Sequence, residues 1–486
     1  MDRGDRFMQS QELIKLIDQI LTLKTETNNI EFKKAHDGIP ENLYDSFSSF
    51  SNTSGGILIF GIDEKNNYNI SGITNADLLQ KRVTEQALMM EPKIRPIITF
   101  CEYKDKVIAA CEIPELDAFS KPCYYTGKGK MKGSYIRVGD ADLPMTEYEI
   151  YSFDAFKYKT EDELRTKDRI DEDFLNPITI NTFIDKITTL KPNLLNMDRE
   201  MILKMNGIID KNNKPTICGI LNFGKYPQYF SPNLDIVAVR CATSEYGVED
   251  NNEIRFLDNK RLDGTISEML KQALAFVLNN TKKSTRINEL GEREDILEYP
   301  IKAIREIILN AIIHRDYSIH TENDPIRLTI YDDRIEVTNP GGLYGRLTLD
   351  DLGQARSDIR NPFIASILEV LEITENRYSG IPTIYAEMKK AGLMEPKFEN
   401  NRGTFKVTLF NSKQSEKLND NFIDKIKAFC KTPRTKESIA KQFGFNEANP
   451  TYFIKAYIKP LIEKGILGYT IPNKPRSKNQ KIYTIE

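Results

Sequence analysis

The sequence predicts several domains of mixed α/β and α+β structure. The chain has 486 residues, which corresponds to roughly three domains of ordinary size. Short apolar runs of strand length alternate with segments in which apolar residues recur at helical spacing. Hydrophobic residues make up 40% of the chain and charged residues 29%. This composition is typical of a globular protein with enough apolar material for several cores.

Charge is distributed unevenly along the chain. The formal net charge of −3 excludes a polybasic nucleic-acid binder over the full length. Residues 413–486 contain fifteen Lys or Arg and seven Asp or Glu, a net charge of +8, so the rest of the chain carries −11. A basic C-terminal module on an acidic body indicates an anionic partner for that module.

Cysteine, histidine and hydropathy patterns argue against several classes of protein. The six cysteines form no C-x-x-C pair and the chain has three histidines, so neither structural zinc nor a disulfide framework is indicated. The polar start MDRGDRFMQSQELI lacks the apolar core of a signal peptide. No run approaches the ~18 apolar residues of a membrane span. We therefore expect a cytoplasmic protein that does not act in a membrane.

The first domain is expected over residues 8–155. Its central element is the fully apolar run Ile57–Ile62, typical of a buried strand that ends at Asp63. The other expected elements, in chain order, are a helix over 8–23, a short strand ending near Lys33, a helix through Leu43, Phe47 and Phe50, two strands within 94–112, and short strands at 123–125 and 134–138 that flank a basic glycine loop at 127–133.

A charged stretch at 156–175 is expected to link this domain to the next, within a connecting α/β subdomain over 156–295. A third domain is assigned to 296–411 and a fourth to 419–486. The elements expected in the second and third domains are strands at Cys218–Phe223 and Asp235–Cys241, a helix at Met269–Leu278, a helix at Ala303–Tyr317, strands at Arg327–Tyr331 and Arg334–Thr338, helices at 360–371 and up to Lys390, and a closing strand at Thr404–Phe410.

The helix expected at Ala303–Tyr317 carries the first candidate chemistry. Its isoleucines form a broad apolar face, and Glu306 and Asn310, four residues apart, project from one side. A carboxylate and a carboxamide on one turn can orient a water and hold Mg²⁺. Taken alone, the pattern favours a core helix with a solvated polar edge. We expect His314 to be structural and Arg315 to pair with Asp316.

A second constellation lies near the N-terminus. Glu26, Glu31 and Lys33 precede Asp63, which sits at the end of a buried strand, where α/β folds place sites. Three carboxylates and a lysine can bind a divalent cation and position a phosphodiester. The alternative is that Lys33 pairs with Glu31 or Glu26 at a sheet edge.

The segments ETNNIEFK, SFSNTSGGILIFGIDE and KPCYYTGKGKMKGSYIRVGD resemble, in this order, the Schlafen/AlbA-type domain over about residues 8–150. This resemblance implies either DNA binding or, as in Schlafen-type nucleases, RNA cleavage with Mg²⁺ or Mn²⁺. In the second case Glu26, Glu31 and Asp63 would be the catalytic metal ligands and Lys33 would lie beside the phosphate. In both cases Lys128, Lys130, Lys132 and Arg137 would contact the nucleic-acid backbone; the alternative is a solvated hairpin.

Residues 296–410 resemble the GHKL superfamily of Bergerat-type ATP-binding domains, an α/β sandwich. The resemblance implies that Asn310 coordinates Mg²⁺ on the phosphates of ATP and that Glu306 activates water or supports a slow switch. Further nucleotide contacts would come from Asn339, Gly341, Gly342, Ser379, Gly380 and Thr404. Asn339 stands where the superfamily usually has an aspartate that reads adenine. The chain has no G-x-x-x-x-G-K-[ST], so a P-loop helicase motor is excluded.

The C-terminal module follows the plan helix, helix, turn, helix, basic hairpin, with Thr435 placed to cap the second helix. It resembles the winged helix-turn-helix modules attached to bacterial transcriptional regulators that are described as RecG-related. The expected phosphate contacts are Lys455, Lys474, Arg476 and Lys478. The alternative is a winged helix that binds protein.

Together these patterns favour an ATP-responsive DNA-binding transcriptional regulator, forming a homo-oligomer, with a dimer expected by analogy. The alternative is a metal-dependent endoribonuclease that cleaves tRNA or other RNA, serves in anti-phage defence and is gated by ATP. A third hypothesis is an interaction scaffold with an inactive nucleotide fold.

Overall fold

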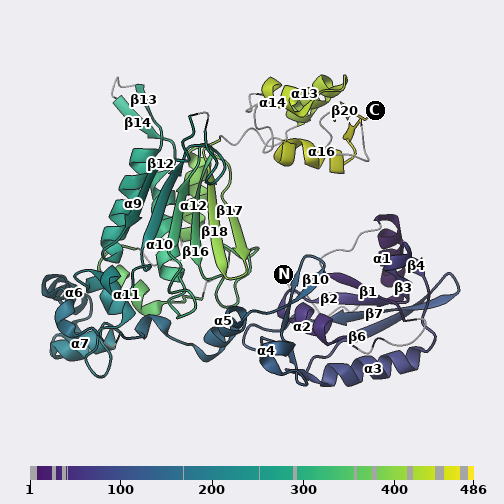
Figure 1. Ribbon diagram of the computed structural model, residues 1–486, viewed down its shortest axis with the longest axis horizontal. Helices are drawn as coiled ribbons and strands as arrows, with labels where there is room; N and C mark the ends of the chain where they lie inside the picture. The colour runs from purple at the N-terminus through teal and green to yellow at the C-terminus, as the bar shows by residue number, and fades with distance from the viewer. Residues whose placement is uncertain are drawn as a thin grey trace. The chain divides into compact units, whose positions relative to one another are not determined.

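The computed structural model describes residues 8–23, 29–35, 40, 42–167, 169–250, 252–287, 293–354, 358–374, 380–412, 420–443, 454–470 and 480–485. They form two compact units (Figure 1). The first consists of Met1–Ala391 and Pro396–Asn411, and the second of Gly392–Glu395 and Ser412–Glu486. No helix among the described residues has the length and apolar character needed to cross a membrane.

The N-terminal part of the first unit is a four-stranded sheet between two helical layers. The strand order is β1 (Ile30–Lys33), β2 (Gly56–Phe60), β7 (Lys106–Ile113), β6 (Ile97–Tyr103), with β1 parallel to β2 and the other pairs antiparallel. One face packs on α1 (Ser10–Leu23), the other on α2 (Tyr44–Asn52) and α3 (Ala76–Leu88). Leu58, Ile59 and Phe60 are fully buried. The expected central buried strand is thus confirmed.

Helix α2 carries a buried polar face that fastens the hairpin region to the sheet. Ser48 Oγ donates to Cys123 O at 2.7 Å and accepts from Tyr135 N at 2.8 Å. Asn52 exchanges hydrogen bonds with both backbone groups of Cys123, at 2.6 and 2.9 Å. These contacts position β8 (Tyr124–Tyr125), β9 (Tyr135–Val138) and β10 (Ala141–Pro144). The expected glycine loop between β8 and β9 instead contains one helical turn, α4 (Gly129–Gly133).

The larger sheet of the first unit has six strands. Their order is β12 (Phe256–Leu262), β11 (Ile236–Cys241), β15 (Ile326–Ile330), β16 (Arg334–Pro340), β18 (Thr404–Phe410), β17 (Lys397–Asn401). Helices α9 (Ile266–Asn280), α10 (Ile301–His314) and α12 (Gly380–Lys390) form one layer against this sheet (Figure 1). The boundary predicted at residue 296 is wrong, because β11 and β12 complete the same sheet as β15–β18.

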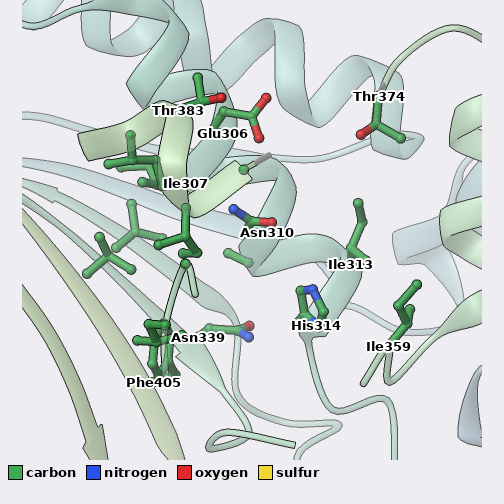
Figure 2. Close-up of a pocket in the computed structure, with 18 of the residues that line it drawn as sticks. Glu306, Ile307, Asn310, Ile313, His314, Asn339, Ile359, Thr374, Thr383 and Phe405 are labelled. Carbon is green, nitrogen blue, oxygen red and sulfur yellow. The ribbon is translucent and has the colours of Figure 1, made fainter. Parts of the chain in front are cut away.

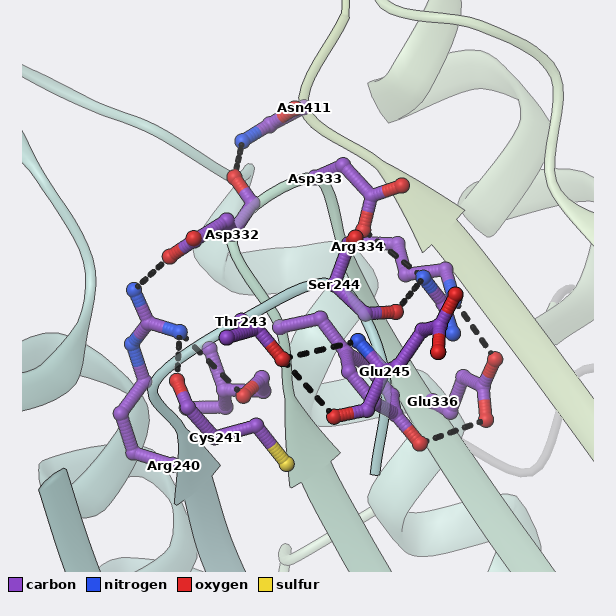
Figure 3. A network of polar contacts seen from close by, with 12 residues as sticks. Arg240, Cys241, Thr243, Ser244, Glu245, Asp332, Asp333, Arg334, Glu336 and Asn411 are labelled. Carbon is purple, nitrogen blue, oxygen red and sulfur yellow. Dashed lines mark hydrogen bonds and ion pairs between the residues drawn. The ribbon is translucent and has the colours of Figure 1, made fainter. Parts of the chain in front are cut away.

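The start of β16 is held by a polar network at the end of the strand opposite Pro340 (Figure 3). Arg334 donates to Glu336 at 2.7 Å and to Ser244 O at 3.0 Å. Arg240 pairs with Asp332 at 2.7 Å. These contacts join the chain after β11 to the turn between β15 and β16.

The strand predicted at Cys218–Phe223 is wrong: these residues belong to helix α8 (Ile217–Phe223). Every residue of α8 is buried, so the run has neither helical nor strand periodicity. The N-cap favours a helix here, because Thr216 Oγ1 accepts from Gly219 N at 3.0 Å.

The linker predicted at 156–175 is also wrong, because this segment is built into the fold. It begins inside α5 (Glu147–Tyr158). Glu163 is fully buried and accepts hydrogen bonds from the N–H groups of Phe363 at 3.0 Å and Ile364 at 2.8 Å. It therefore caps helix α11 (Pro362–Val370) from a segment distant in the sequence.

The second unit contains α13 (Asp420–Cys430), α14 (Lys436–Gln442), a helical segment formed by Ile454–Ile458 and α16 (Lys459–Glu463), and an antiparallel hairpin of β19 (Leu467–Tyr469) and β20 (Ile482–Thr484). Thr435 caps α14 as predicted, accepting from Ser438 N at 3.3 Å. The core joins all of these elements through Ile426, Ile439, Leu461, Leu467 and Ile482.

The buried carboxyl group of Glu163 should make the free energy of unfolding of this protein depend on pH. Burial raises its pKa from 4.5 to about 7, against the effect of the two backbone hydrogen bonds. Between these values the unfolded chain releases the proton while the folded chain keeps it, so stability falls as pH rises, by up to about 1.4 kcal/mol per pH unit. Glu163→Gln should remove this component. Urea unfolding of both proteins from pH 4.5 to 7.5 measures the difference; parallel curves for the two proteins would contradict the role of Glu163.

Candidate functional site

Helix α10 presents a polar stripe to a cavity of about 640 Å³. Lys302, Glu306, Asn310 and His314 recur every four residues, and all four line the cavity. Residues at this spacing share one face of a helix. Figure 2 shows Glu306, Asn310 and His314 on successive turns. The apolar residues of α10 are buried, so packing of the helix fixes the direction in which the stripe points.

Residues from β16 and the connection after it, from α12 and from β18 also line the cavity. Asn339, Gly341 and Gly342 come from the end of β16 and the loop that follows it; Gly380 and Thr383 come from the first turn of α12; Phe405 comes from β18; and Leu343, Tyr344, Leu347, Leu352 and Ile359 come from the long connection after β16. The structure thus brings together six of the predicted nucleotide-contacting residues, namely Glu306, Asn310, Asn339, Gly341, Gly342 and Gly380. Ser379 lies outside the described residues.

Two amide groups in this cavity have an atom without a hydrogen-bond partner among the described residues. They are Asn310 Nδ2 and Asn339 Oδ1, and both atoms are buried. Asn339 is 4% exposed. A buried polar atom without a partner costs stability, so a bound ligand that satisfies both atoms would recover that cost. The cavity therefore offers one donor and one acceptor to a polar ligand.

Gly380 approaches the α10 stripe more closely than other residues can. A β-carbon at this position would lie 3.0 Å from Asn310 Nδ2 and 3.1 Å from Glu306 Oε2. Gly380 is the first residue of the 11-residue helix α12. Backbone N–H groups at a helix N-terminus attract anions. Glycine here therefore lets the N-terminus of α12 come close to Glu306 and Asn310 on α10.

His314 lies on the same stripe as a neutral imidazole. Burial, reinforced by the nearby Arg360 guanidinium, lowers its pKa to about 4. At neutral pH it therefore offers the cavity one donor and one acceptor and no charge. The sequence predicted only a structural role for His314, whereas the structure also places it in the lining of the cavity.

The loop that carries Asn339 is anchored by a buried carboxylate. Asp316 pairs with Arg360 at 3.2 Å and accepts from Tyr148 OH at 2.8 Å, while its own N–H donates to Pro340 O at 3.0 Å. Arg360 also donates to Gly342 O at 3.1 Å. Gly341 has a φ of +101°, which favours glycine.

Charge balance in this network keeps Asp316 ionised. Burial raises its pKa, but Arg360 and the hydrogen bonds from Ser318 and Tyr148 outweigh burial and hold the pKa below its usual range. The predicted ion pair of Arg315 with Asp316 is wrong, because Asp316 is paired with Arg360. Arg315 is buried and lies 3.4 Å from the carbonyl oxygens of Asn233 and Thr321.

The predicted contact of Thr404 with the cavity is wrong by one residue. Its side chain is exposed, its hydroxyl donates to Asn401 O at 2.9 Å, and the neighbouring Phe405 lines the cavity instead. Phe405 lies opposite Asn339 in the ladder of β16 and β18. Successive residues of a strand point to opposite faces, so only one of Thr404 and Phe405 can face α10.

Glu31, one of the three predicted N-terminal carboxylates, is held by two cations. Glu31 pairs with Lys33 and with Arg137 at 3.2 Å, and Arg137 also pairs with Asp142 at 2.8 Å. Within the described ranges no three His, Cys, Asp or Glu side chains are grouped so as to hold a metal. Asp63 does not end the central strand as predicted, because β2 ends at Phe60 and Asp63 belongs to the separate strand β3 (Ile62–Asp63). Glu26 lies outside those ranges. The pairing of Lys33 with Glu31 matches the sheet-edge alternative.

The basic residues of this domain are in different environments. Arg137 is 8% exposed and pairs with two carboxylates, which argues against its predicted contact with a phosphate backbone. Lys128 pairs with Asp45 at 3.3 Å and Lys130 with Asp154 at 2.8 Å, whereas Lys132 is exposed on α4. In the second unit, Lys474, Arg476, Lys478 and the side chain of Lys455 lie outside what the structure describes.

Comparison with known families places these sites in context. Residues 26–146 match the family "Schlafen, AlbA_2", and residues 323–409 match "Putative ATP-dependent DNA helicase recG C-terminal", a GHKL-like ATPase fold. The chain combines a Schlafen/AlbA-type domain with a GHKL-like ATPase domain. Residues 424–484 match "Filamentation induced by cAMP protein Fic-like, C-terminal domain". No curated protein gives a significant match.

Two solved structures are similar to this chain. The DIP2311 protein from Corynebacterium diphtheriae is 19% identical over 94% of this chain and 93% of that one, with a TM-score of 0.39. The N-terminal domain of a RecG-related protein from Nitrosomonas europaea is 25% identical over 29% of this chain and 95% of that one, with a TM-score of 0.23.

Asp316→Ala should destabilise the protein strongly, because it leaves Arg360 buried without its partner. The expected loss is about 3–5 kcal/mol of unfolding free energy. Asp332→Ala is the matched control: Asp332 also pairs with an arginine, but its side chain is 54% exposed, and Arg240 keeps its bond to Cys241 O at 2.6 Å. The control should lose about 0–1 kcal/mol. Urea unfolding measures both, and equal losses would contradict the anchoring role of Asp316.

Proposed function

We propose that this protein binds ATP with Mg²⁺ and that its nucleotide state controls how it engages DNA, as in a transcriptional regulator. One observation carries the proposal: the fold gathers Glu306, Asn310, Asn339 and Gly380 around a single cavity. Its volume lies in the range of small-molecule sites, ~300–1,000 Å³. The GHKL-like family match over 323–409 supports the same ligand.

The side chains suggest how the nucleotide is oriented. Asn310 supplies an oxygen suited to Mg²⁺, a hard cation that neutralises phosphate charge. The first turn of α12, which starts at Gly380, offers N–H groups to the phosphates. Asn339 Oδ1, buried and without a partner among the described residues, is suited to accept from the amino group of adenine. Glu306 is then placed to orient a water near the phosphates.

Asn310→Ala should abolish the thermal stabilisation that Mg²⁺-ATP gives to the full-length protein, since it removes the proposed metal ligand. Asn280→Ala is the matched control, because Asn280 is a half-buried helical asparagine of α9 that lies outside the cavity lining. Thermal unfolding with and without about 0.1 mM nucleotide, about a hundredfold above an expected micromolar Kd, measures the effect. A shift retained in the Asn310 variant would refute the assignment.

Structural contacts connect the cavity to the nucleic-acid-binding domain. Helix α5 begins at Glu147, directly after the Schlafen/AlbA match. Tyr148 bonds to Asp316, and Glu149 pairs with Arg402 at 2.8 Å, next to the Gly403 carbonyl that accepts from Gly341 N. A nucleotide that moves the Asn339–Gly342 loop would therefore act on α5 as well.

The environment of Glu31 supports DNA binding as the role of the first domain. Its carboxylate is neutralised by Lys33 and Arg137, which lowers its value as a metal ligand. Exposed Lys132 and the net charge of +8 on residues 413–486 provide positive surface for a phosphate backbone.

Lys132→Gln should weaken duplex DNA binding and lower the slope of log affinity against log salt by about one. Lys104→Gln, at an exposed turn, should change neither quantity. Fluorescence anisotropy with a labelled duplex, with and without a non-hydrolysable ATP analogue, measures both effects. Affinity that is independent of nucleotide would refute nucleotide control. RNA cleavage that needs Mn²⁺ and disappears in Glu31→Ala would instead establish the nuclease alternative.

A further inference from the structure

Three side chains that can carry positive charge line the cavity. One of them is neutral, and another is already hydrogen-bonded to the backbone. These side chains are Lys302, Arg305 and His314. His314 is neutral, because its pKa is lowered to about 4. Arg305 donates a hydrogen bond to Ile373 O and so holds the segment that follows α11. Lys302 alone among these three is exposed and has no ion-pair partner within the described parts of the chain.

Lys302 also occupies a position that does not stabilise its helix. It is the second residue of α10, whose first turn contains no acidic residue. A cation at the N-terminal end of a helix is disfavoured by the helix dipole. Its N-cap residue, Pro300, makes no side-chain capping bond. Helix stability therefore does not explain a lysine here, whereas an anion in the cavity would.

The order of residues along α10 indicates which anion this is. His314 lies toward the end of the helix that approaches the Asn339 loop, since Asp316 N–H bonds to Pro340 O. Asn310 and Glu306 face Gly380. Lys302 lies one turn beyond Glu306, about 6 Å further along the axis at 1.5 Å per residue. A nucleotide with its base at Asn339 and its metal at Asn310 would extend its last phosphate toward this turn.

We infer that Lys302 binds the terminal phosphate of a nucleoside triphosphate and thereby makes the cavity distinguish ATP from ADP. This inference rests on the proposed nucleotide binding and adds a specificity-determining residue to it. A lysine ammonium binds phosphate as a compact charge with three donors. A diphosphate held by the same base and metal contacts would end before the ammonium.

The test is isothermal titration calorimetry of the full-length protein with Mg²⁺ and either ADP or a non-hydrolysable ATP analogue. Lys302→Gln keeps the length and polarity of the side chain but removes its charge. It should weaken binding of the ATP analogue about tenfold and leave ADP affinity within about twofold. Lys302→Arg should keep most of the preference for the triphosphate. Lys389→Gln, at an exposed lysine of α12 outside the cavity lining, should change neither affinity.

The other possible outcomes would refute either the role of Lys302 alone or the proposed nucleotide binding together with it. Equal weakening of both ligands, or no weakening, would refute the role of Lys302 while nucleotide binding stands. If the wild-type protein binds neither ligand and its circular dichroism is that of a folded protein, both the proposed function and this inference fail.

Discussion

The buried ion pair of Asp316 and Arg360 is the constraint on which the cavity depends. The two side chains are 6% and 8% exposed, and charges removed from water to this degree must be satisfied by each other and by further hydrogen bonds. The further bonds come from Tyr148, Ser318 and the Gly342 carbonyl. Satisfying this pair therefore brings together α5, the end of α10, the Asn339–Gly342 loop and the segment before α11.

Once that loop is in place, α10 and α12 define the chemistry of the cavity. The apolar side of α10 is buried, so its polar stripe faces the loop. Gly380 lets the N-terminus of α12 approach Glu306 and Asn310 to a distance at which a β-carbon would have only 3.1 and 3.0 Å. The result is a carboxylate, an amide and a helix N-terminus around one space, which suits a phosphate with its cation.

Buried ion pairs and hydrogen bonds also organise the N-terminal domain, but there they connect its elements to one another. Arg137 is buried between Glu31 and Asp142, and Asp142 also accepts from Ser46 at 2.9 Å and from Ser49 at 2.5 Å. Asn52, which belongs to the segment SFSNTSGGILIFGIDE, and Ser48, just before that segment, bond to the backbone of the hairpin region. Much of the sequence pattern that resembles the Schlafen/AlbA type thus stabilises the fold of this domain. Exposed basic side chains such as Lys132 are not part of these contacts.

The sequence by itself determined the elements whose patterns are local. Isoleucines at helical spacing predicted the helix of Glu306 and Asn310, the run Ile57–Ile62 predicted the central strand, and Thr435 predicted the start of α14. It also predicted which six residues from three distant segments share a site, through the resemblance to a known superfamily.

Only the tertiary structure decided the features that depend on contacts between distant residues. Tyr148 and Asp316 are 168 positions apart, and no local pattern encodes their bond or the choice of Arg360 over Arg315. The fully buried run Cys218–Phe223 has no periodicity, so its N-cap and surroundings made it a helix. The register of β16 against β18 placed Phe405, and not Thr404, in the cavity. Side-chain pattern specifies an element, whereas burial and pairing across the fold specify which of its faces lines the cavity.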